Sequence, residues 1–260
     1  MSLDPVITSA IAKSCKEAES VLFITGAGIS AESNLPTYRG VGGLYDTGET
    51  EEGLPIEELL SGEMMAEDPA VCWKYIHQIE KACRGAKPNL AHEIVAKFDG
   101  LVKRTWVVTQ NVDGFHTRAG STNVIEMHGN ISRLKCTACS YQSRVDNYEG
   151  LGSVPICPKC GAVVRPDVVL FGEMLSDWAI NTLRNELERG FDVVFSIGTT
   201  SAFPYISAPV VLAARRGATT VEINPQSTPI SGLVSHCLRA KAGESLSAIW
   251  HALQLACATP

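Results

Sequence analysis

Several features that would direct a chain to a membrane, to nucleic acid or out of the cell are missing from this sequence. No apolar run approaches the roughly 20 residues that a membrane-spanning helix needs. The first residues lack a basic segment followed by a long apolar one, so we expect no secretory signal. The formal net charge is −6, and no basic block occurs. We therefore expect neither nucleic acid nor a membrane as a direct partner.

The sequence has nine cysteines, but it lacks the cysteine pattern of a disulfide-bonded secreted domain, because four of them are spaced as metal ligands. Cys136-x2-Cys139 is followed, after seventeen residues, by Cys157-x2-Cys160, which is typical of a zinc ribbon. Four thiolates on two short turns would leave a tetrahedral ion no open position, so we expect structural zinc. Two disulfides, four free thiols and an iron–sulfur cluster are the alternatives. A reducing cytoplasm is the simplest location for such a chain.

Apolar or β-branched runs alternate with helical stretches along most of the chain. The expected strands are residues 21–25, 105–109, 123–127, 192–197 and 219–223. This alternation predicts an open parallel α/β sheet. Ligands bind beyond the carboxyl ends of the strands in such sheets. The turns after the strands should therefore gather at one edge; they are residues 26–30, 110–113, 198–201 and 224–226.

The turn after the first strand has the pattern of a dinucleotide-binding loop. Gly26, Gly28 and Ala31 fit G-x-G-x-x-A, where small residues let backbone N–H groups approach a pyrophosphate. An acidic residue on a second strand, about 20 residues later, would ordinarily hold the ribose. Asp46 has that spacing but lies in a glycine-rich loop. The loop thus indicates a dinucleotide with an unusual ribose contact, and ordinary hydride transfer is not favoured.

Polar residues follow the second and third expected strands. Gln110-Asn111-Val112-Asp113 is placed to hold ribose hydroxyls or a carboxamide; equally, Asp113 could cap the next helix. His128 ends the third strand, and its intrinsic pKa suits a general base near neutral pH. A histidine at a strand end is more often structural, so this residue alone indicates no function.

Together these residues resemble the sirtuins, the NAD-dependent protein-lysine deacylases, and in particular a compact prokaryotic-type member. The resemblance runs in order over nearly the whole chain. It rests on residues 26–33, 36–39, 110–113, 128–129, the four cysteines, 171–173, 198–200 and 222–225. It implies an α/β fold with a Rossmann-like parallel sheet and helices on both faces, plus a small zinc-ribbon module and a helical insertion.

The resemblance divides the chain into three expected parts. The Rossmann-like NAD-binding domain comprises residues 1–39, 87–130 and 169–260. Residues 40–86 form a cofactor loop and helical module, and residues 131–168 form a zinc-binding module.

The family's chemistry implies that NAD is a co-substrate and that no hydride moves. NAD loses nicotinamide, and the acyl group passes from lysine to ADP-ribose. His128 would be the general base on the ribose hydroxyls, Asn111 would hold the ribose and a water, and Asp113 would accept from the nicotinamide carboxamide. The residues implied to contact NAD are Gly26, Ala27, Gly28, Ser30, Ala31, Glu32, Thr37, Tyr38, Arg39, Gln110, Asn111, Val112, Asp113, Gly198, Thr199, Thr200, Asn224, Pro225, Gln226 and Ala242.

An acyl-lysine peptide is the partner that the resemblance implies, and we expect it to bind in extended form through its main chain, as an added strand. Its implied contacts are Val168, Val169, Phe171, Gly172 and Glu173. This mode reads backbone more than side chains, so sequence specificity should be loose. The chain is expected to be a monomer or a weak oligomer.

The acyl group is expected to be neutral. Sirtuins that remove succinyl or malonyl groups carry Tyr and Arg three residues apart on one helix. The corresponding residues are Ile76 and Ile79 here or, with a one-residue gap, Tyr75 and Gln78. Neither register supplies an arginine for a distal carboxylate, and burying an unpaired charge is costly. Acetyl, or a longer aliphatic group, is therefore expected.

Two other functions remain open on the sequence. A protein mono-ADP-ribosyltransferase would use the same NAD site, with a protein side chain as the nucleophile. A non-catalytic NAD-binding module would leave the joint presence of His128, Asn111 and Asp113 unexplained.

Overall fold

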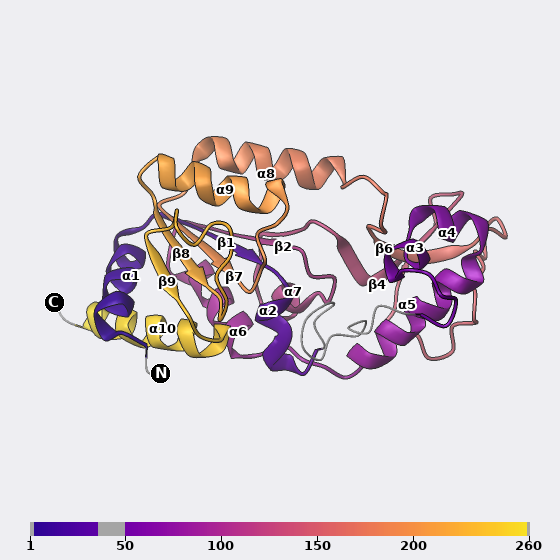
Figure 1. The fold of residues 1–260 in the computed structure, drawn as a ribbon, viewed down its shortest axis with the longest axis horizontal. Helices are drawn as coiled ribbons and strands as arrows, with labels where there is room; N and C mark the ends of the chain where they lie inside the picture. Colours follow the sequence, from indigo (N-terminus) through magenta and orange to yellow (C-terminus); the bar gives the residue numbers. More distant parts are fainter. Residues whose placement is uncertain (1–2, 36–49, 259–260) are drawn as a thin grey trace.

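A six-stranded parallel sheet forms one end of the molecule (Figure 1). The computed structural model describes residues 3–35 and 50–258. The strand order is β3-β2-β1-β7-β8-β9. The strands are β1 (Ser20–Thr25), β2 (Arg104–Thr109), β3 (Val124–Glu126), β7 (Val193–Ile197), β8 (Thr219–Ile223) and β9 (His236–Leu238). Five of them confirm the expected strands; β9 was not expected.

The strand order reverses between β1 and β7. From β1 the chain adds β2 and β3 on one side, and later β7, β8 and β9 on the other. In open parallel sheets the ligand site lies at such a reversal, beyond the carboxyl ends of the strands. The topology therefore directs attention to the turns that follow β1 and β7.

Helices cover both faces of this sheet, as expected (Figure 1). On one face lie α1 (Pro5–Glu17), α6 (Leu90–Lys97) and α10 (Ala242–Ala258), and on the other lie α8 (Asp177–Arg189) and α9 (Pro204–Arg215). The N-terminus of α1 follows from the sequence, because the Asp4 side chain accepts from the Val6 N–H and proline is the first helical residue. Short helices follow two strands: α2 (Ala27–Ser30) after β1 and α7 (Phe115–Ala119) after β2.

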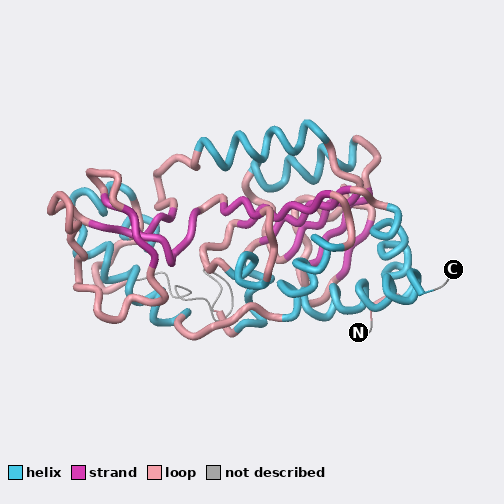
Figure 2. The backbone as a smooth tube through the Cα atoms, turned by 180° about the vertical axis from the view of Figure 1, so that it is seen from behind, coloured by secondary structure: helices cyan, strands magenta, loops and turns pink. Residues whose placement is uncertain are grey.

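A second lobe lies at the other end of the molecule (Figures 1 and 2). It combines α3 (Ile56–Leu59), α4 (Gly62–Glu67) and α5 (Pro69–Cys83) with an antiparallel sheet. That sheet has the order β5-β4-β6, with β4 (Gly129–Cys136), β5 (Gln142–Arg144) and β6 (Val164–Val168). The sequence showed little periodicity here because most of these strand residues are only half-buried.

The helical and cysteine-bearing segments pack on a single hydrophobic core. Trp73 of α5 is fully buried against Tyr148, with ring centroids 5.6 Å apart, and its indole N–H donates to the Val164 carbonyl at 3.0 Å. Residues that are far apart in sequence thus form one lobe. No helix within residues 3–35 and 50–258 is long and apolar enough to cross a membrane.

Gly129 lies where the two lobes join. It pairs with Val168 in the antiparallel sheet, and the next residue, Val169, donates its N–H to the His128 carbonyl at 2.9 Å. The φ of Gly129 is +80°, and a Cβ there would lie 2.0 Å from the Asp167 carbonyl oxygen. Only glycine fits this backbone contact.

We expect Gly129→Ala to lower the free energy of unfolding by about 3 kcal/mol or more, because it adds a backbone clash to an unfavourable positive φ. The matched control is Gly150→Ala, where φ is +81° but no atom lies within 4 Å of the new Cβ. The control should cost about 1 kcal/mol. Urea unfolding of both variants measures the difference, and equal losses would refute the contact at Gly129.

Candidate active site

Two glycine-containing loops touch at the carboxyl ends of β1 and β7. Gly26 N–H donates to the Ile197 carbonyl at 3.0 Å, and Gly28 N–H donates to the Gly198 carbonyl at 2.8 Å. A Cβ on Gly28 would lie 2.6 Å from the Gly198 Cα, and one on Gly26 would lie 2.8 Å from the Gly198 oxygen. Positions 26 and 28 therefore require glycine because the two loops pack closely. The sequence had suggested a different reason, which is the approach of a pyrophosphate to the backbone.

Ser30, Asn111 and Asp113 form one hydrogen-bonded cluster. The Asn111 amide donates to the Gly26 carbonyl and to Ser30 Oγ, both at 3.1 Å, and Ser30 Oγ donates to Asp113 Oδ2 at 2.7 Å. The turns after β1 and β2 therefore come together as expected. Asp113 Oδ1 also accepts from the Phe115 N–H at 2.9 Å at the start of α7, which confirms the capping interpretation of Asp113. Burial raises the pKa of Asp113, and the bonds from Phe115 and Ser30 oppose that rise.

Two buried histidines lie behind this cluster. His116 Nε2 is 2.9 Å from Thr25 Oγ1, His92 Nε2 is 3.4 Å from Ser30 Oγ, and the two ring centroids are 4.9 Å apart. Burial lowers the pKa of His92 to about 4, and burial together with His92 lowers that of His116 to about 3. Both imidazoles are uncharged at neutral pH. We predicted no role for these histidines from the sequence, because no local sequence pattern indicates that α6 and α7 bring them together.

A second set of hydrogen bonds joins the turns after β2, β7 and β8. Thr199 Oγ1 donates to Gln110 Oε1 at 2.8 Å, and the Asn224 amide donates to the Thr199 carbonyl at 2.9 Å. Gln226 N–H donates to Asn224 Oδ1 at 3.0 Å. Thr200 and Pro225 lie on the same turns. The structure therefore brings these predicted positions to one edge of the sheet.

The remaining predicted NAD positions fall into three groups. Glu32 accepts from Gly243 N–H at 2.7 Å, so its carboxylate caps α10 beside Ala242. Ala27 begins α2 and Ala31 follows it, while the Val112 carbonyl accepts from Ile131 N–H at 2.9 Å. Thr37, Tyr38 and Arg39 lie outside the described residues, as do Asp46 and most of the expected cofactor loop.

His128 is half-buried just after β3, and both sides of its imidazole are engaged. Its Nε2 lies 2.7 Å from the hydroxyl of Tyr205, at the start of α9. Burial lowers the pKa of His128, while a bond to the Gln110 backbone raises it, and the net shift is downward. The imidazole is therefore neutral at pH 7, as a general base requires. Tyr205 was not expected, since 77 residues separate it from His128.

The segment expected to contact the peptide lies beside His128 and is held by both lobes. Val169 donates to the His128 carbonyl, while Phe171 pairs with the loop between α3 and α4. In that pairing Phe171 N–H donates to the Leu60 carbonyl, and Gly62 N–H donates to the Phe171 carbonyl, each at 3.0 Å. These backbone groups are used within the protein, so a peptide would pair with others in this segment.

Glu173 supports this segment from within. Its carboxylate accepts from Arg165 Nη2 at 2.8 Å and from the Leu170 N–H at 2.9 Å. Burial alone would raise the pKa of Glu173, but these two donors lower it overall. The side chain therefore holds the shape of the loop that carries Gly172.

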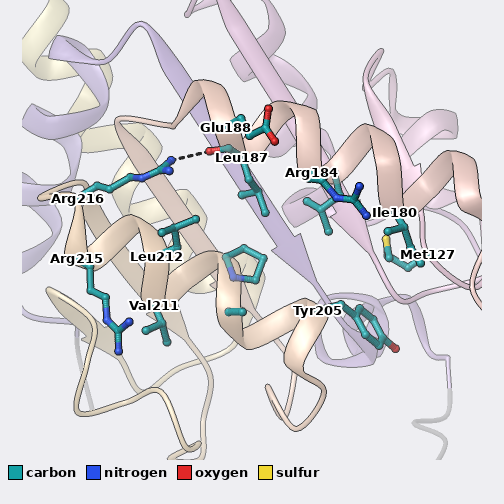
Figure 3. Close-up of a pocket in the computed structure, with 13 residues that line it drawn as sticks. Met127, Ile180, Arg184, Leu187, Glu188, Tyr205, Val211, Leu212, Arg215 and Arg216 are labelled. Carbon is teal, nitrogen blue, oxygen red and sulfur yellow. Dashed lines mark hydrogen bonds between the residues drawn. The ribbon is translucent and has the colours of Figure 1, made fainter.

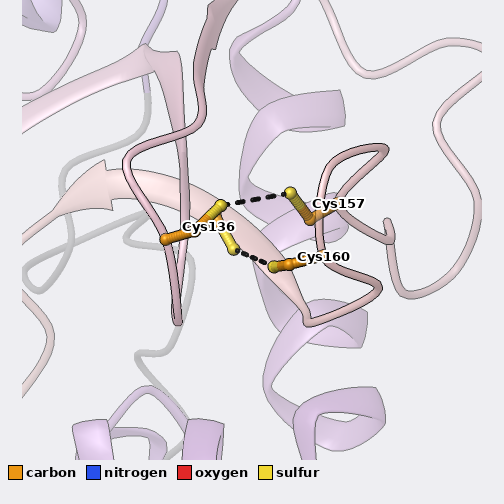
Figure 4. A group of neighbouring side chains, drawn as sticks. Cys136, Cys157 and Cys160 are labelled. Carbon is orange, nitrogen blue, oxygen red and sulfur yellow. Dashed lines mark hydrogen bonds between the residues drawn. The ribbon is translucent and has the colours of Figure 1, made fainter.

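The four predicted cysteine ligands converge at one point of the second lobe (Figure 4). Their sulfurs all lie within 4.8 Å of one another; Cys136 and Cys160 are 3.5 Å apart, and Cys139 and Cys157 are 3.6 Å apart. Sulfurs about 2.3 Å from a tetrahedral zinc ion would be separated by about 3.8 Å. The Ala138 N–H also donates to Cys136 Sγ at 3.3 Å, which favours a thiolate. The donor set fits a structural zinc ion with no open coordination position.

Comparison with known proteins gives one consistent result. The sequence model of the Sir2 family matches residues 26–203. The chain is 48% identical over 239 residues to NAD-dependent protein deacylase 2 of Pseudomonas syringae pv. tomato, covering 91% of this chain and 96% of that protein.

Solved structures agree with this result. A mutant Sir2 homologue in complex with ADP-ribose has a TM-score of 0.87 at 34% identity and covers 96% of this chain and 98% of its own. A Sir2 protein with a deacetylated peptide and 3′-O-acetyl ADP-ribose has a TM-score of 0.81 at 26% identity, covering 94% and 97%.

We expect purified protein to carry one zinc ion per chain, measured by elemental mass spectrometry. The Cys139→Ser variant should lose the metal and melt at a lower temperature. Only three thiolate ligands would remain, which is too few for a structural zinc site that closes the turns of the second lobe. Cys257→Ser is the matched control, since that thiol is exposed on α10, and it should keep the zinc. Iron in place of zinc, or full stability after chelation, would contradict this assignment.

Proposed function

Because the chain belongs to the Sir2 family and is an NAD-dependent protein deacylase, we propose roles for its residues in which His128 is the general base. NAD lies across the turns that follow β1, β2, β7 and β8. One observation carries this proposal: Ser30, Asn111 and Asp113 form a single hydrogen-bonded cluster at the carboxyl ends of β1 and β2, next to the reversal of strand order between β1 and β7. A neutral imidazole, bonded to the backbone of Gln110, adjoins that edge.

The glycine turn shapes the dinucleotide site. The N–H groups of Gly26 and Gly28 already donate to the β7 strand end and the Gly198 loop. We therefore assign these glycines to the close packing that forms the cradle, and assign pyrophosphate contact to neighbouring groups of the turn such as Ala27. Asn111 and Asp113 lie deeper, where the ribose and the nicotinamide carboxamide would be held.

His128 supplies the proton acceptor. NAD contributes the ribose carbon that the acyl oxygen attacks as nicotinamide leaves. Nε2 of His128 then accepts the proton of a ribose hydroxyl, and the freed oxygen attacks the acyl carbon. Water finally releases lysine and O-acyl-ADP-ribose. Because burial lowers the pKa of His128, the imidazole keeps its base function below pH 6.5, and activity is lost only as pH falls further.

We place the acyl-lysine peptide beside residues 168–173, extended and paired through its main chain. The anchoring of this segment by His128, Leu60 and Gly62 supports that placement, since a rigid edge lowers the entropy cost of adding a strand. The solved relative in complex with a deacetylated peptide supports a peptide as the class of substrate. We place the reaction in the cytoplasm, because four convergent thiols persist in a reducing compartment.

The described part of α5 favours a neutral acyl group. Ile76 is buried, and Ile79 packs against the core of the second lobe. In the alternative register, Gln78 is exposed and the Tyr75 hydroxyl donates to Glu52, a carboxylate of the chain itself. Neither register offers a distal acyl carboxylate a cation.

His128→Ala should abolish deacetylation and leave NAD binding nearly unchanged, because only the proton acceptor is removed. Mass spectrometry of an acetyl-lysine peptide with NAD measures this; wild type should give equal amounts of deacetylated peptide, nicotinamide and O-acetyl-ADP-ribose. The control His251→Ala removes an exposed histidine from α10 and should be as active as wild type. If wild type adds ADP-ribose to a target that keeps its acetyl group, the transferase is favoured. If wild type binds NAD but turns over no substrate, the non-catalytic module is favoured.

For acyl choice, we expect kcat/KM for a succinyl-lysine peptide to be at least about 100-fold below that for the acetyl peptide, since an unpaired charge would have to be buried. Ile79→Arg should narrow this gap by raising the succinyl rate, and Ile79→Gln, which adds length without charge, should not. Equal rates for the two acyl groups in wild type would show that the acyl site lies elsewhere.

A further inference from the structure

Tyr205 contacts the proposed general base, and no motif in the sequence identifies it. It follows Pro204 in the first turn of α9, where its ring stacks on Phe203 with centroids 5.4 Å apart and planes at 18°. Its ring meets that of His128 edge to face, at 6.1 Å and 78°. Its hydroxyl lies 2.7 Å from His128 Nε2. The Phe203 ring thus holds this phenol against the imidazole.

The directions of the neighbouring hydrogen bonds determine which atom carries each proton. Ser201 N–H donates to Thr199 Oγ1 at 3.2 Å, and Thr199 Oγ1 donates to Gln110 Oε1 at 2.8 Å. The amide of Gln110 must therefore present its N–H groups on the other side, and the Gln110 side chain lowers the pKa of Tyr205, as a donor that faces the phenol oxygen does. The partner of the Tyr205 O–H is then His128 Nε2, 2.7 Å away.

The other side of the imidazole completes the arrangement. The Gln110 carbonyl accepts a hydrogen bond from His128. Because Nε2 faces Tyr205, we assign the donated proton to Nδ1. Nε2 then carries the lone pair that a general base needs, and Gln110 contacts both rings, one through its backbone and one through its side chain.

We propose that Tyr205 is a positioning residue for His128: its O–H donates to Nε2, fixes the direction of that lone pair, and stabilises the neutral imidazole until a ribose hydroxyl takes its place. This inference rests on the role proposed for His128. Tyr205 belongs to α9 and also lines a groove between α8 and α9 (Figure 3). We assign no ligand to that groove.

Tyr205→Phe is the direct test, because it keeps the stacked ring and removes only the hydroxyl. Loss of a donor to Nε2 destabilises the neutral imidazole, so the pKa of His128 should rise by about half a pH unit or more. We expect an NMR titration of the His128 ring, without substrate, to show this rise. The acid limb of kcat/KM should move to higher pH by the same amount, giving a loss of about threefold or more at pH 5 and little loss at pH 8.

Tyr148→Phe is the matched control. It removes another tyrosine hydroxyl, one that donates to the Ile131 carbonyl at 2.7 Å in the second lobe, and it should leave the pKa of His128 and the acid limb unchanged. If His128→Ala is inactive but Tyr205→Phe titrates like wild type, the positioning role is overturned and the proposed function stands. If His128→Ala turns over normally, the proposed function falls, and the titration still shows whether Tyr205 stabilises the neutral ring.

Discussion

Contact between two backbones is the constraint on which the site depends. At the reversal of strand order, Gly28 donates to Gly198 at 2.8 Å, and no Cβ fits between the loops. This contact joins the ends of β1 and β7. It places Thr199 within 2.8 Å of Gln110 and the Gly26 carbonyl within 3.1 Å of the Asn111 amide. A side chain at either glycine would separate the loops and with them most of the polar groups of the site.

Burial keeps most of the titratable groups of this site uncharged. His92, His116 and His128 all have lowered pKa values, with burial as the largest cause. Asp113 can then keep its hydrogen bonds to Ser30 and Phe115 without competition from a neighbouring imidazolium. A site that contains an uncharged base and a hydrogen-bonded carboxylate suits a reaction that cleaves a dinucleotide and then removes a proton from a hydroxyl.

The second lobe supports the chemistry from a distance. The cysteine cluster closes the turns beside β4 and β6, and these strands share a core with α5. Gly129 and Val169 connect that sheet to His128, while Glu173 and Arg165 hold the loop that follows. A structural zinc ion, which takes no part in the reaction, can therefore influence the segment that we propose to bind the peptide.

The sequence by itself determined the central sheet, the four cysteine ligands and the dinucleotide turn. Fully buried parallel strands such as residues 21–25 are apolar over most of their length, two ligand pairs require fixed spacing, and a tight turn requires glycine. Each of these constraints acts over a few neighbouring residues, so each leaves a local pattern. The short β9 and the half-buried strands of the second lobe left no such pattern.

Tertiary structure alone decided which polar groups meet. Ser30 reaches Asp113 because β1 and β2 are neighbours, and His92 reaches His116 because α6 and α7 pack together. Tyr205 reaches His128 across 77 residues because α9 begins beside the end of β3. Contacts of this kind depend on how whole elements pack, and no periodicity or spacing in the chain records them.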